Sequence, residues 1–588
     1  MNREEIEDQY KWDLTTMFKN QAAFDEQFKL SKALLATLVK SQGKISINKH
    51  SFVTFMEQLE TFQRYLSNLY SYASLCGDVE PNNQQVQENK ASALLLYQQA
   101  SIALSFVDIE FIQNQATIET YLKDQAAIDF NYPLQEVFRS IPHRLSEDQE
   151  KLMAQVSQIA MNPQETYDAF RLEFEDVIID GKPQFLNAAT YSEFLRNPNV
   201  EVRKQAYENL FKEYKRYENV FASTLTGHAQ GQVLDAQVHH FDSALQASLF
   251  EDGVDETLFN KVLDMANHKH HQGCIDYYKY HQEVLGLNQQ HPYDIALPIV
   301  NDIDIKYSIE ECFSILNKAF APLGEEYLSL LNRAKDEHWI DFMTHPGKRP
   351  GAYSGGSYDS NPYVLMNFTG GYDSLSTLAH ELGHSMHSYY SNKNNRPLLS
   401  DYRIFVAEIA STVNEILLNK YLLANSEDKQ YKAYILANLL EQLVGTLYRQ
   451  PMFAKFEVYL YDCIEKGEAI STSTLTSYYE KITKEYFGDS VICDELEKYR
   501  CYYVPHFYYN FYVYKYTLGM SVALSFVRKI EKGETSDYLN FLKKGGSESP
   551  LEECIHGGVD PLSDQIYDDA FDFFNETLNQ LKTLQKKD

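Results

Sequence analysis

The five residues His380-Glu381-Leu382-Gly383-His384 restrict the possible folds of this chain more than any other segment. On an α-helix, two histidines four positions apart lie on one face, where both imidazoles can reach a single metal ion. Glu381 lies beside them. Its carboxylate can accept a proton from a zinc-bound water, whose pKa the metal lowers to roughly 7. The spacing therefore predicts a helix that carries a hydrolytic metal centre.

The flanking residues favour a helix at this position. Asp373 is expected to be its N-cap. Apolar residues follow with the spacing of a buried helical stripe, namely Leu375, Leu378, Ala379, Leu382 and Met386. A pattern this short arises by chance in roughly a few per cent of chains of this length, so it needs a supporting context. The amphipathic helix provides that context and favours a metal site over the alternative, in which the two histidines are merely partly exposed surface residues.

A tetrahedral zinc site with two histidines and a water needs one more protein ligand. Residues 405–418 predict the next acidic helix, and Glu408 lies on or beside its apolar stripe. A carboxylate on a buried face needs a partner, so we interpret Glu408 as the third ligand of one Zn²⁺ per chain. Glu415, further along the same face, either orients a ligand histidine or is solvated or salt-bridged.

Residues 376–415 closely resemble the M3 zinc metallopeptidases, specifically the bacterial oligoendopeptidase F group. Weaker similarity extends over most of residues 110–575, including segments 339–341, 348–354, 362–368 and 505–516. The resemblance implies zinc, hydrolysis of internal bonds in short peptides, and a large, mainly α-helical fold with an enclosed substrate channel. It also implies that His380, His384 and Glu408 bind the metal and that Glu381 is the general base.

In this family a histidine and one or more tyrosines of the His/Tyr-rich segment, residues 505–516, bind the substrate and the developing oxyanion. A positioned donor of this kind stabilises the charge by roughly 3–4 kcal/mol. We expect His506, near the start of a helix, to be catalytic. Tyr512 and Tyr514 compete for the oxyanion role with Tyr509, which is also expected to bind substrate. Since the chain has 44 tyrosines, any one of them can instead be a core residue.

Two segments upstream of the metal helix predict a peptide-binding surface. Residues 351–358 are glycine-rich without the pattern of a phosphate loop, and we expect a mobile hairpin tip. Residues 362–368 predict a short edge strand, which can bind an extended peptide by main-chain hydrogen bonds. We therefore expect Tyr353, Gly355 and Tyr363 to bind substrate. The alternative is an ordinary hairpin packed on the helical core.

The composition predicts a cytoplasmic enzyme. Acidic residues outnumber basic ones 83 to 53, and the net charge of -30 disfavours nucleic acid and anionic membranes as partners. The acidic N-terminus lacks the apolar segment of a secretory signal, and no uninterrupted apolar stretch approaches the roughly 18 residues that span a bilayer. Seven scattered cysteines without a C-x-x-C pair indicate reduced thiols. The sequence leaves the oligomeric state open.

Helical periodicity dominates the chain, and the predicted strands lie within residues 338–370, beside the metal helix. The breaks at 181–183 and 197–199 predict an N-terminal helical domain over residues 1–195 and a catalytic domain over 196–588. Two alternatives to an endopeptidase stay open. One is a peptidase of the same zinc class that releases dipeptides or single residues from a C-terminus. The other is a non-catalytic helical peptide-binding protein, which would not need Glu381.

Overall fold

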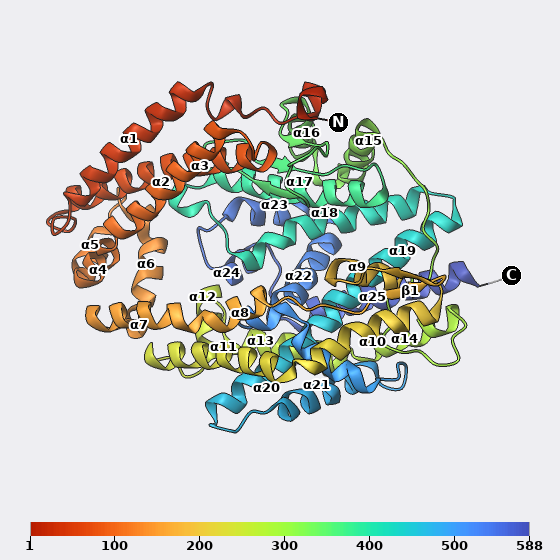
Figure 1. Cartoon of the computed structure of the whole chain (residues 1–588). Coiled ribbons are helices and arrows are strands. Elements are labelled where there is room, and N and C mark those ends of the chain that lie inside the picture. The colour runs from red at the N-terminus through yellow and green to blue at the C-terminus, as the bar shows by residue number, and fades with distance from the viewer. Residues whose placement is uncertain (1, 587–588) are drawn as a thin grey trace. The chain divides into compact units, whose positions relative to one another are not determined.

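The computed structural model describes residues 2–586 and confirms the mainly α-helical fold, with one two-stranded and one three-stranded sheet in this part of the chain (Figure 1). The chain divides into two compact units, each assembled from three separate segments. Unit 1 takes Met1–Pro142, Asp304–Ala424 and Ala523–Val559, and unit 2 takes His143–Ile303, Asn425–Val522 and Asp560–Asp588. The predicted domain boundary between residues 195 and 196 stays a prediction.

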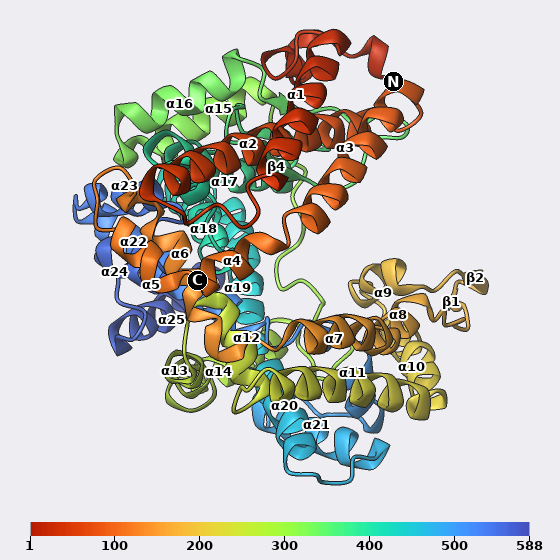
Figure 2. The same cartoon turned by 90° about the vertical axis from the view of Figure 1, so that its left-hand side faces the viewer.

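Unit 1 carries the metal-binding motif. Its helices are α1 (Gln21–Val39), α2 (Lys49–Val79), α3 (Gln84–Ala103), α4 (Phe106–Gln113), α5 (Gln115–Tyr121), α6 (Asn131–Arg139), α15 (Ile309–Ala319), α16 (Glu325–Asp336), α17 (Tyr372–Asn394), α18 (Ile404–Asn425), α23 (Thr535–Lys544) and α24 (Pro550–His556). Asparagine side chains cap three of the N-terminal helices, Asn20 at α1, Asn48 at α2 and Asn83 at α3. Helices α2 and α3 pack side by side (Figure 2).

The helical stretch Gln84–Gln113 is long and apolar enough to cross a bilayer, judged by length and composition alone. Core helices of globular proteins meet the same criterion. Within unit 1 this stretch packs on α2, and Ala93, Leu96 and Ala100 are buried in the common core. Other apolar side chains of α3 are exposed, among them Leu95 and Tyr97.

The three-stranded sheet of unit 1 corrects one prediction from the sequence. Its strand order is β3 (Ile340–Asp341), β5 (Tyr363–Leu365), β4 (Tyr353–Gly355), with β5 parallel to β3 and antiparallel to β4. The strand predicted as an edge, β5, is therefore the central strand, and all three of its residues are buried. The free edge belongs to β4, in the segment predicted as a hairpin tip.

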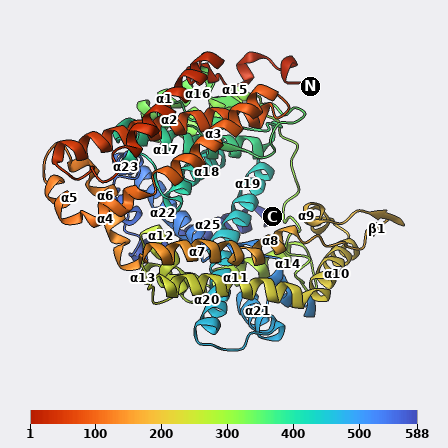
Figure 3. The same cartoon turned by 60° about the vertical axis from the view of Figure 1, so that its left-hand side comes forward.

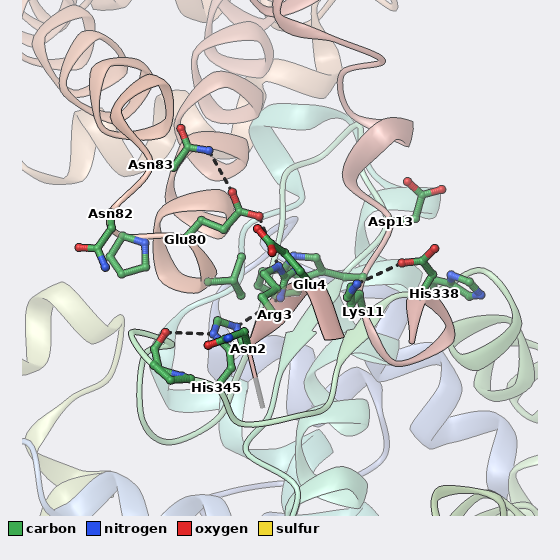
Figure 4. Close-up of a pocket in the computed structure, with 15 residues that line it drawn as sticks. Asn2, Arg3, Glu4, Lys11, Asp13, Glu80, Asn82, Asn83, His338 and His345 are labelled. Atoms are coloured by element: carbon green, nitrogen blue, oxygen red, sulfur yellow. Dashed lines mark hydrogen bonds and ion pairs between the residues drawn. The ribbon is translucent and has the colours of Figure 1, made fainter. Parts of the chain in front are cut away.

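The N-terminal segment, residues 2–18, covers the other edge of this sheet. The Phe342 backbone N–H donates to the Tyr10 carbonyl at 2.9 Å, and the Asp13 N–H donates to the His338 carbonyl at 2.8 Å. Arg3 pairs with the buried carboxylate of Asp341 at 2.7 Å. A pocket of about 950 Å³ lies beside this segment, lined by Arg3, Lys11, Glu80, His345 and their neighbours (Figure 4).

Unit 2 carries the His/Tyr-rich segment. Its helices are α7 (Glu147–Ala160), α8 (Asn162–Ala169), α9 (Ala188–Leu195), α10 (Val200–Arg216), α11 (Glu218–Val238), α12 (Ala244–Asp252), α13 (Glu256–Asp264), α14 (Gln272–Val284), α19 (Lys429–Val444), α20 (Gln450–Glu465), α21 (Thr472–Phe487) and α25 (Asp564–Gln585). α22 (Tyr514–Glu531) begins in unit 2 and ends in unit 1. Helices α11 and α20 pack against each other (Figure 3).

A β-hairpin in unit 2, which the sequence analysis did not predict, joins β1 (Val177–Ile179) to β2 (Lys182–Gln184). Asp180 and Gly181 form its two-residue turn, with φ angles of 52° and 74°. Both central residues of a type I′ turn need this left-handed conformation, and Asp-Gly is a preferred pair for it. The break predicted at Gly181 is therefore a hairpin turn.

Candidate active site

Two histidines of α17 and one glutamate of α18 bring their ligand atoms together in unit 1. Nε2 of His380 lies 3.2 Å from Nε2 of His384. Oε2 of Glu408 lies 3.4 Å from the first of these nitrogens and 3.6 Å from the second. A tetrahedral zinc site with bonds of about 2.0–2.2 Å places its ligand atoms roughly 3.3 Å apart. The three predicted ligands therefore have the donor types and the spacing that a zinc ion requires.

The orientation of His380 is set by a second glutamate of α18. Nδ1 of His380 donates to Oε1 of Glu415 at 2.8 Å, which leaves Nε2 available to a metal. Burial lowers the pKa of His380, but the bond to Glu415 and the charge of Glu408 outweigh it and raise this pKa to about 9. The alternative in which Glu415 orients a ligand histidine is the arrangement that the structure has.

Glu381 occupies a buried position next to these ligands. Its side chain is 7% exposed, and burial raises the pKa of its carboxyl to about 7, with His380 opposing and Glu408 adding to the shift. The backbone N–H of Ser354 in strand β4 lies near this carboxylate and slightly opposes the rise in its pKa. Ser354 also bonds Ser385 of α17 through its hydroxyl at 2.9 Å. The free edge strand is thus joined directly to the helix of the motif, a contact that the sequence analysis missed.

Gly383, the fourth residue of the motif, allows α17 and α18 to cross in backbone contact. A Cβ atom at this position would lie 2.5 Å from Cα of Ser411 and 2.6 Å from the Ala410 carbonyl oxygen. Only glycine fits at such a distance. Asn414 of α18 also donates to the Ala379 carbonyl at 3.0 Å. The close crossing brings Glu408 to the two histidines.

The start of α17 differs from the prediction. The helix begins at Tyr372 with Gly371 as its N-cap, so Asp373 lies within the first turn and does not cap the helix. The hydroxyl of Ser374 accepts from the backbone N–H groups of Thr369 and Gly370 at 2.9 and 3.2 Å. This serine shapes the entry into the helix.

A third histidine on α17 does not join the ligand set. His387 is fully buried, and its ring stacks on Tyr402 with centroids 3.8 Å apart. Burial and the neighbouring His384 lower its pKa to about 3, so the ring is neutral. Among residues 2–586, neither of its ring nitrogens has a hydrogen-bond partner.

Two of the predicted substrate-binding tyrosines have other contacts. Tyr363 is fully buried, and its hydroxyl donates to the Asp13 carbonyl at 2.8 Å and contacts Thr16. Its prediction as a substrate contact is wrong, because β5 is the central strand. The Tyr353 hydroxyl donates to Asp78 at 2.9 Å. Tyr353 and Gly355 lie on the edge strand β4, paired with Leu365 and Tyr363 of β5, and their role in substrate binding stays a prediction.

The His/Tyr-rich segment of unit 2 is less helical than expected. Residues Pro505–Tyr508 form only a short 3₁₀ helix, η11, and α22 starts at Tyr514. Between them, Asn510 and Phe511 have φ angles of 49° and 56°, a left-handed conformation that non-glycine residues rarely adopt. Buried groups stabilise this turn. Oδ1 of Asn510 lies 2.9 Å from His228 Nε2, and the Phe511 N–H donates to Glu457 at 2.9 Å.

The aromatic residues of this segment separate into two sets. Tyr514 is fully buried and donates to Asp252 at 3.0 Å, so its prediction as an oxyanion donor is wrong. His506, half-buried and with a pKa lowered by burial, contacts the ring of Tyr509, whose side chain is 47% exposed. Tyr512 packs on Tyr516 with centroids 5.4 Å apart. The catalytic roles of His506 and Tyr512 and the substrate contact of Tyr509 stay predictions. The ring of Tyr516 also lies beside His506 and Tyr512, a contact that the sequence analysis did not predict.

A helical protein with two histidines and a glutamate converging on one point, beside a buried glutamate, belongs to the class of metallopeptidases. The comparisons identify the family. The sequence profile of Peptidase family M3 matches residues 194–573, and that of Oligopeptidase F matches residues 113–172. The chain belongs to peptidase family M3.

Relatives match over the whole length of the chain. It is 34% identical to Oligopeptidase PepF of Bacillus subtilis (strain 168), covering 100% of this chain and 89% of that protein. It is 33% identical to an oligoendopeptidase F homolog of Lactococcus lactis subsp. lactis, covering 100% and 99%. Among solved structures, a putative peptidase from Chlamydophila abortus has a TM-score of 0.91, with 31% identity and 99% coverage of both chains. Oligoendopeptidase-F from Enterococcus faecium has a TM-score of 0.73, with 29% identity and coverage of 95% and 98%.

Proposed function

We propose that this metallopeptidase hydrolyses internal bonds of short oligopeptides with one Zn²⁺ bound by His380, His384 and Glu408. The carrying observation is the separation of the three ligand atoms, 3.2–3.6 Å, which fits a tetrahedral ion. When bound, zinc supplies a Lewis acid that activates a water and polarises the substrate carbonyl. The names of the relatives, oligopeptidase and oligoendopeptidase, support internal cleavage of short peptides.

The residues around the ligand group fit the roles that hydrolysis requires. Glu381 has a buried carboxyl with a pKa of about 7, which suits a group that takes a proton from the attacking water and passes it to the leaving amine. Strand β4 presents a free edge that can hold an extended peptide by main-chain hydrogen bonds. The resemblance of the His/Tyr-rich segment supports His506 and Tyr512 as catalytic residues that donate to the developing oxyanion.

The remaining expectations about partners stay part of the proposal. A net charge of -30 supports peptide substrates over nucleic acids or anionic membranes. All seven cysteines are free thiols in the structure, which supports a reducing compartment such as the cytoplasm.

Mass spectrometry of products from a mixed peptide library tests the proposal, together with measurement of bound zinc. We expect about one zinc per chain and cleavage at internal bonds. The rates of hydrolysis of unstructured peptides of about five to forty residues and of a stably folded protein test the enclosed channel. We expect the folded protein to be spared, because a folded substrate must first unfold locally. Release of only C-terminal dipeptides or single residues would favour the exopeptidase alternative. Binding without cleavage would favour a peptide-binding protein.

A further inference from the structure

A second pocket of unit 1, of about 680 Å³, opens at the end of the free edge strand. Its lining residues come from α2, α3, the loop after β4, the second half of α17, and residues 397–402. Gly355, the last residue of β4, lines the pocket, and so does Tyr358 in the following loop. We call it the tyrosine pocket, after Tyr70 and Tyr97 in its wall.

The tyrosine pocket adjoins the two elements that border the proposed catalytic site, β4 and α17. Gly355 directly follows Ser354, whose hydroxyl lies 2.9 Å from that of Ser385, the residue after His384. Ser388, another lining residue, lies one helical turn beyond His384 on α17. A peptide held along β4 at the level of Glu381 therefore continues directly into the pocket.

The pocket wall offers exposed aromatic surface. Tyr70 of α2 and Tyr97 of α3 are 41% and 56% exposed, and their ring centroids lie 6.3 Å apart. Leu66, Pro362 and Leu398 add apolar surface. An aromatic side chain packs well against such rings, since aromatic pairs prefer tilted or edge-to-face contacts at this separation.

The charged and polar groups near these rings are mostly paired with one another. Arg64 makes two hydrogen bonds to the carboxylate of Asp359 and lies 5.3 Å from the ring centre of Tyr358. The hydroxyls of Ser388 and Tyr402 bond each other at 2.9 Å. Asp401 adds an exposed carboxylate, which disfavours an acidic occupant. The chemistry of the wall therefore fits an aromatic or large apolar side chain.

The direction of β4 determines which part of a substrate reaches the pocket. The strand runs from Tyr353, past the contact with Glu381, to Gly355 and the pocket. A peptide that pairs with it antiparallel, the commoner arrangement, runs from the pocket toward Glu381. At about 3.3 Å per residue, the three residues before the cleaved bond span roughly 10 Å along the strand toward the pocket.

We propose that the tyrosine pocket binds an aromatic or large apolar side chain of the substrate, within about three residues N-terminal to the cleaved bond. The inference rests on the proposed peptidase function and adds its substrate class. Tyr70 and Tyr97 are the residues that determine this specificity.

The test uses the zinc-loaded full-length enzyme and a set of peptides that carry phenylalanine or alanine at each position around one cleavable bond. We expect kcat/KM of the wild type to favour phenylalanine at one of the three preceding positions. Tyr70→Ala and Tyr97→Ala should each reduce this preference by roughly tenfold, the effect of a lost apolar contact. Tyr70→Phe and Tyr97→Phe should retain it, since the ring makes the contact.

Ile102→Ala is the matched control, because Ile102 lies on α3, is 78% exposed, and does not line the pocket. Thermal unfolding of each variant checks that the fold is retained. Three outcomes would overturn this inference but leave the proposed function intact. They are an unchanged preference for phenylalanine in both alanine variants, an equal loss of that preference in Ile102→Ala, and a tyrosine-dependent preference C-terminal to the cleaved bond. Absence of hydrolysis by the wild type would overturn the proposed function, and the inference with it.

Discussion

Glu408 and Glu415, on the same helix, contact opposite nitrogens of the His380 ring. Oε2 of Glu408 lies 3.4 Å from Nε2, and Oε1 of Glu415 lies 2.8 Å from Nδ1. The Glu415 contact fixes the tautomer and the orientation of the His380 ring. The Glu408 oxygen lies where it and Nε2 of His380 would bind the same metal ion. The two carboxylates therefore have separable effects, although they are chemically identical.

We predict that Glu408→Ala loses zinc and activity together, because it removes one of three ligands. Glu415→Ala should have a milder effect of roughly 10- to 100-fold on zinc affinity or activity, as expected for a partner of a ligand histidine. Zinc titration and peptide hydrolysis measure both. A larger loss of zinc affinity at position 415 than at 408 would require the two roles to be exchanged.

Glu381→Gln should retain zinc and reduce kcat by about 10²–10⁴-fold. The amide keeps the size of the side chain but cannot accept the proton of the attacking water. Metal content and turnover are measured on the same preparation. Loss of zinc, or a rate above roughly a tenth of the wild type, would contradict the assignment of Glu381 as the general base.

Gly383→Ala should destabilise the protein by about 1–3 kcal/mol and weaken zinc binding, because the added methyl group meets the backbone of α18. Gly445→Ala is the control. Gly445 also has helical φ and ψ angles, and nothing lies within 4 Å of its Cβ position. That change should be neutral or stabilise by up to about 1 kcal/mol. Chemical denaturation measures the stability of both variants. Equal effects at the two positions would show that the helix crossing tolerates a side chain, contrary to the prediction.

Glu553 predicts a pH dependence of stability. Burial raises the pKa of this carboxyl to about 9, with Glu548 adding to the shift and Lys544 and Arg403 opposing it. The unfolded chain ionises near pH 4.3, so the folded state holds the extra proton between these values and stability falls as pH rises through this range. Glu553→Gln should thus gain about 1–3 kcal/mol relative to the wild type between pH 5 and pH 9. Denaturation at both pH values checks it, and an equal difference at both would contradict the buried neutral carboxyl.

The ligand arrangement was predictable because local spacing carries it. The i, i+4 histidines and the apolar stripe around Glu408 are both properties of single helices, and the structure brings those two helices together. The strand order was not predictable from local pattern. β5 is central because β3 pairs with its other edge, and Tyr363 is buried because Thr16 and Asp13, far away in the sequence, cover it.

The burial of Tyr514 likewise depends on a distant residue, Asp252 of α12. The left-handed pair Asn510 and Phe511 has no signal in residue propensity beyond the tolerance of asparagine for this conformation. Side chains from three other helices determine it, His228, Ser248 and Glu457. Where long-range contacts override local preference, sequence spacing alone places the functional candidates in the correct segment but not in the correct orientation.

The division of unit 1 among three chain segments affects its biosynthesis. α17, which carries the histidines, packs against α23, and Asn395 just after α17 donates to the Lys543 carbonyl at 2.8 Å. At 5–20 residues per second, a ribosome needs roughly seven to thirty seconds after Glu408 to reach the end of α23. During that time the ligand residues exist without the helix that supports them. A nascent chain therefore completes the packing around α17 only after most of the protein has been made.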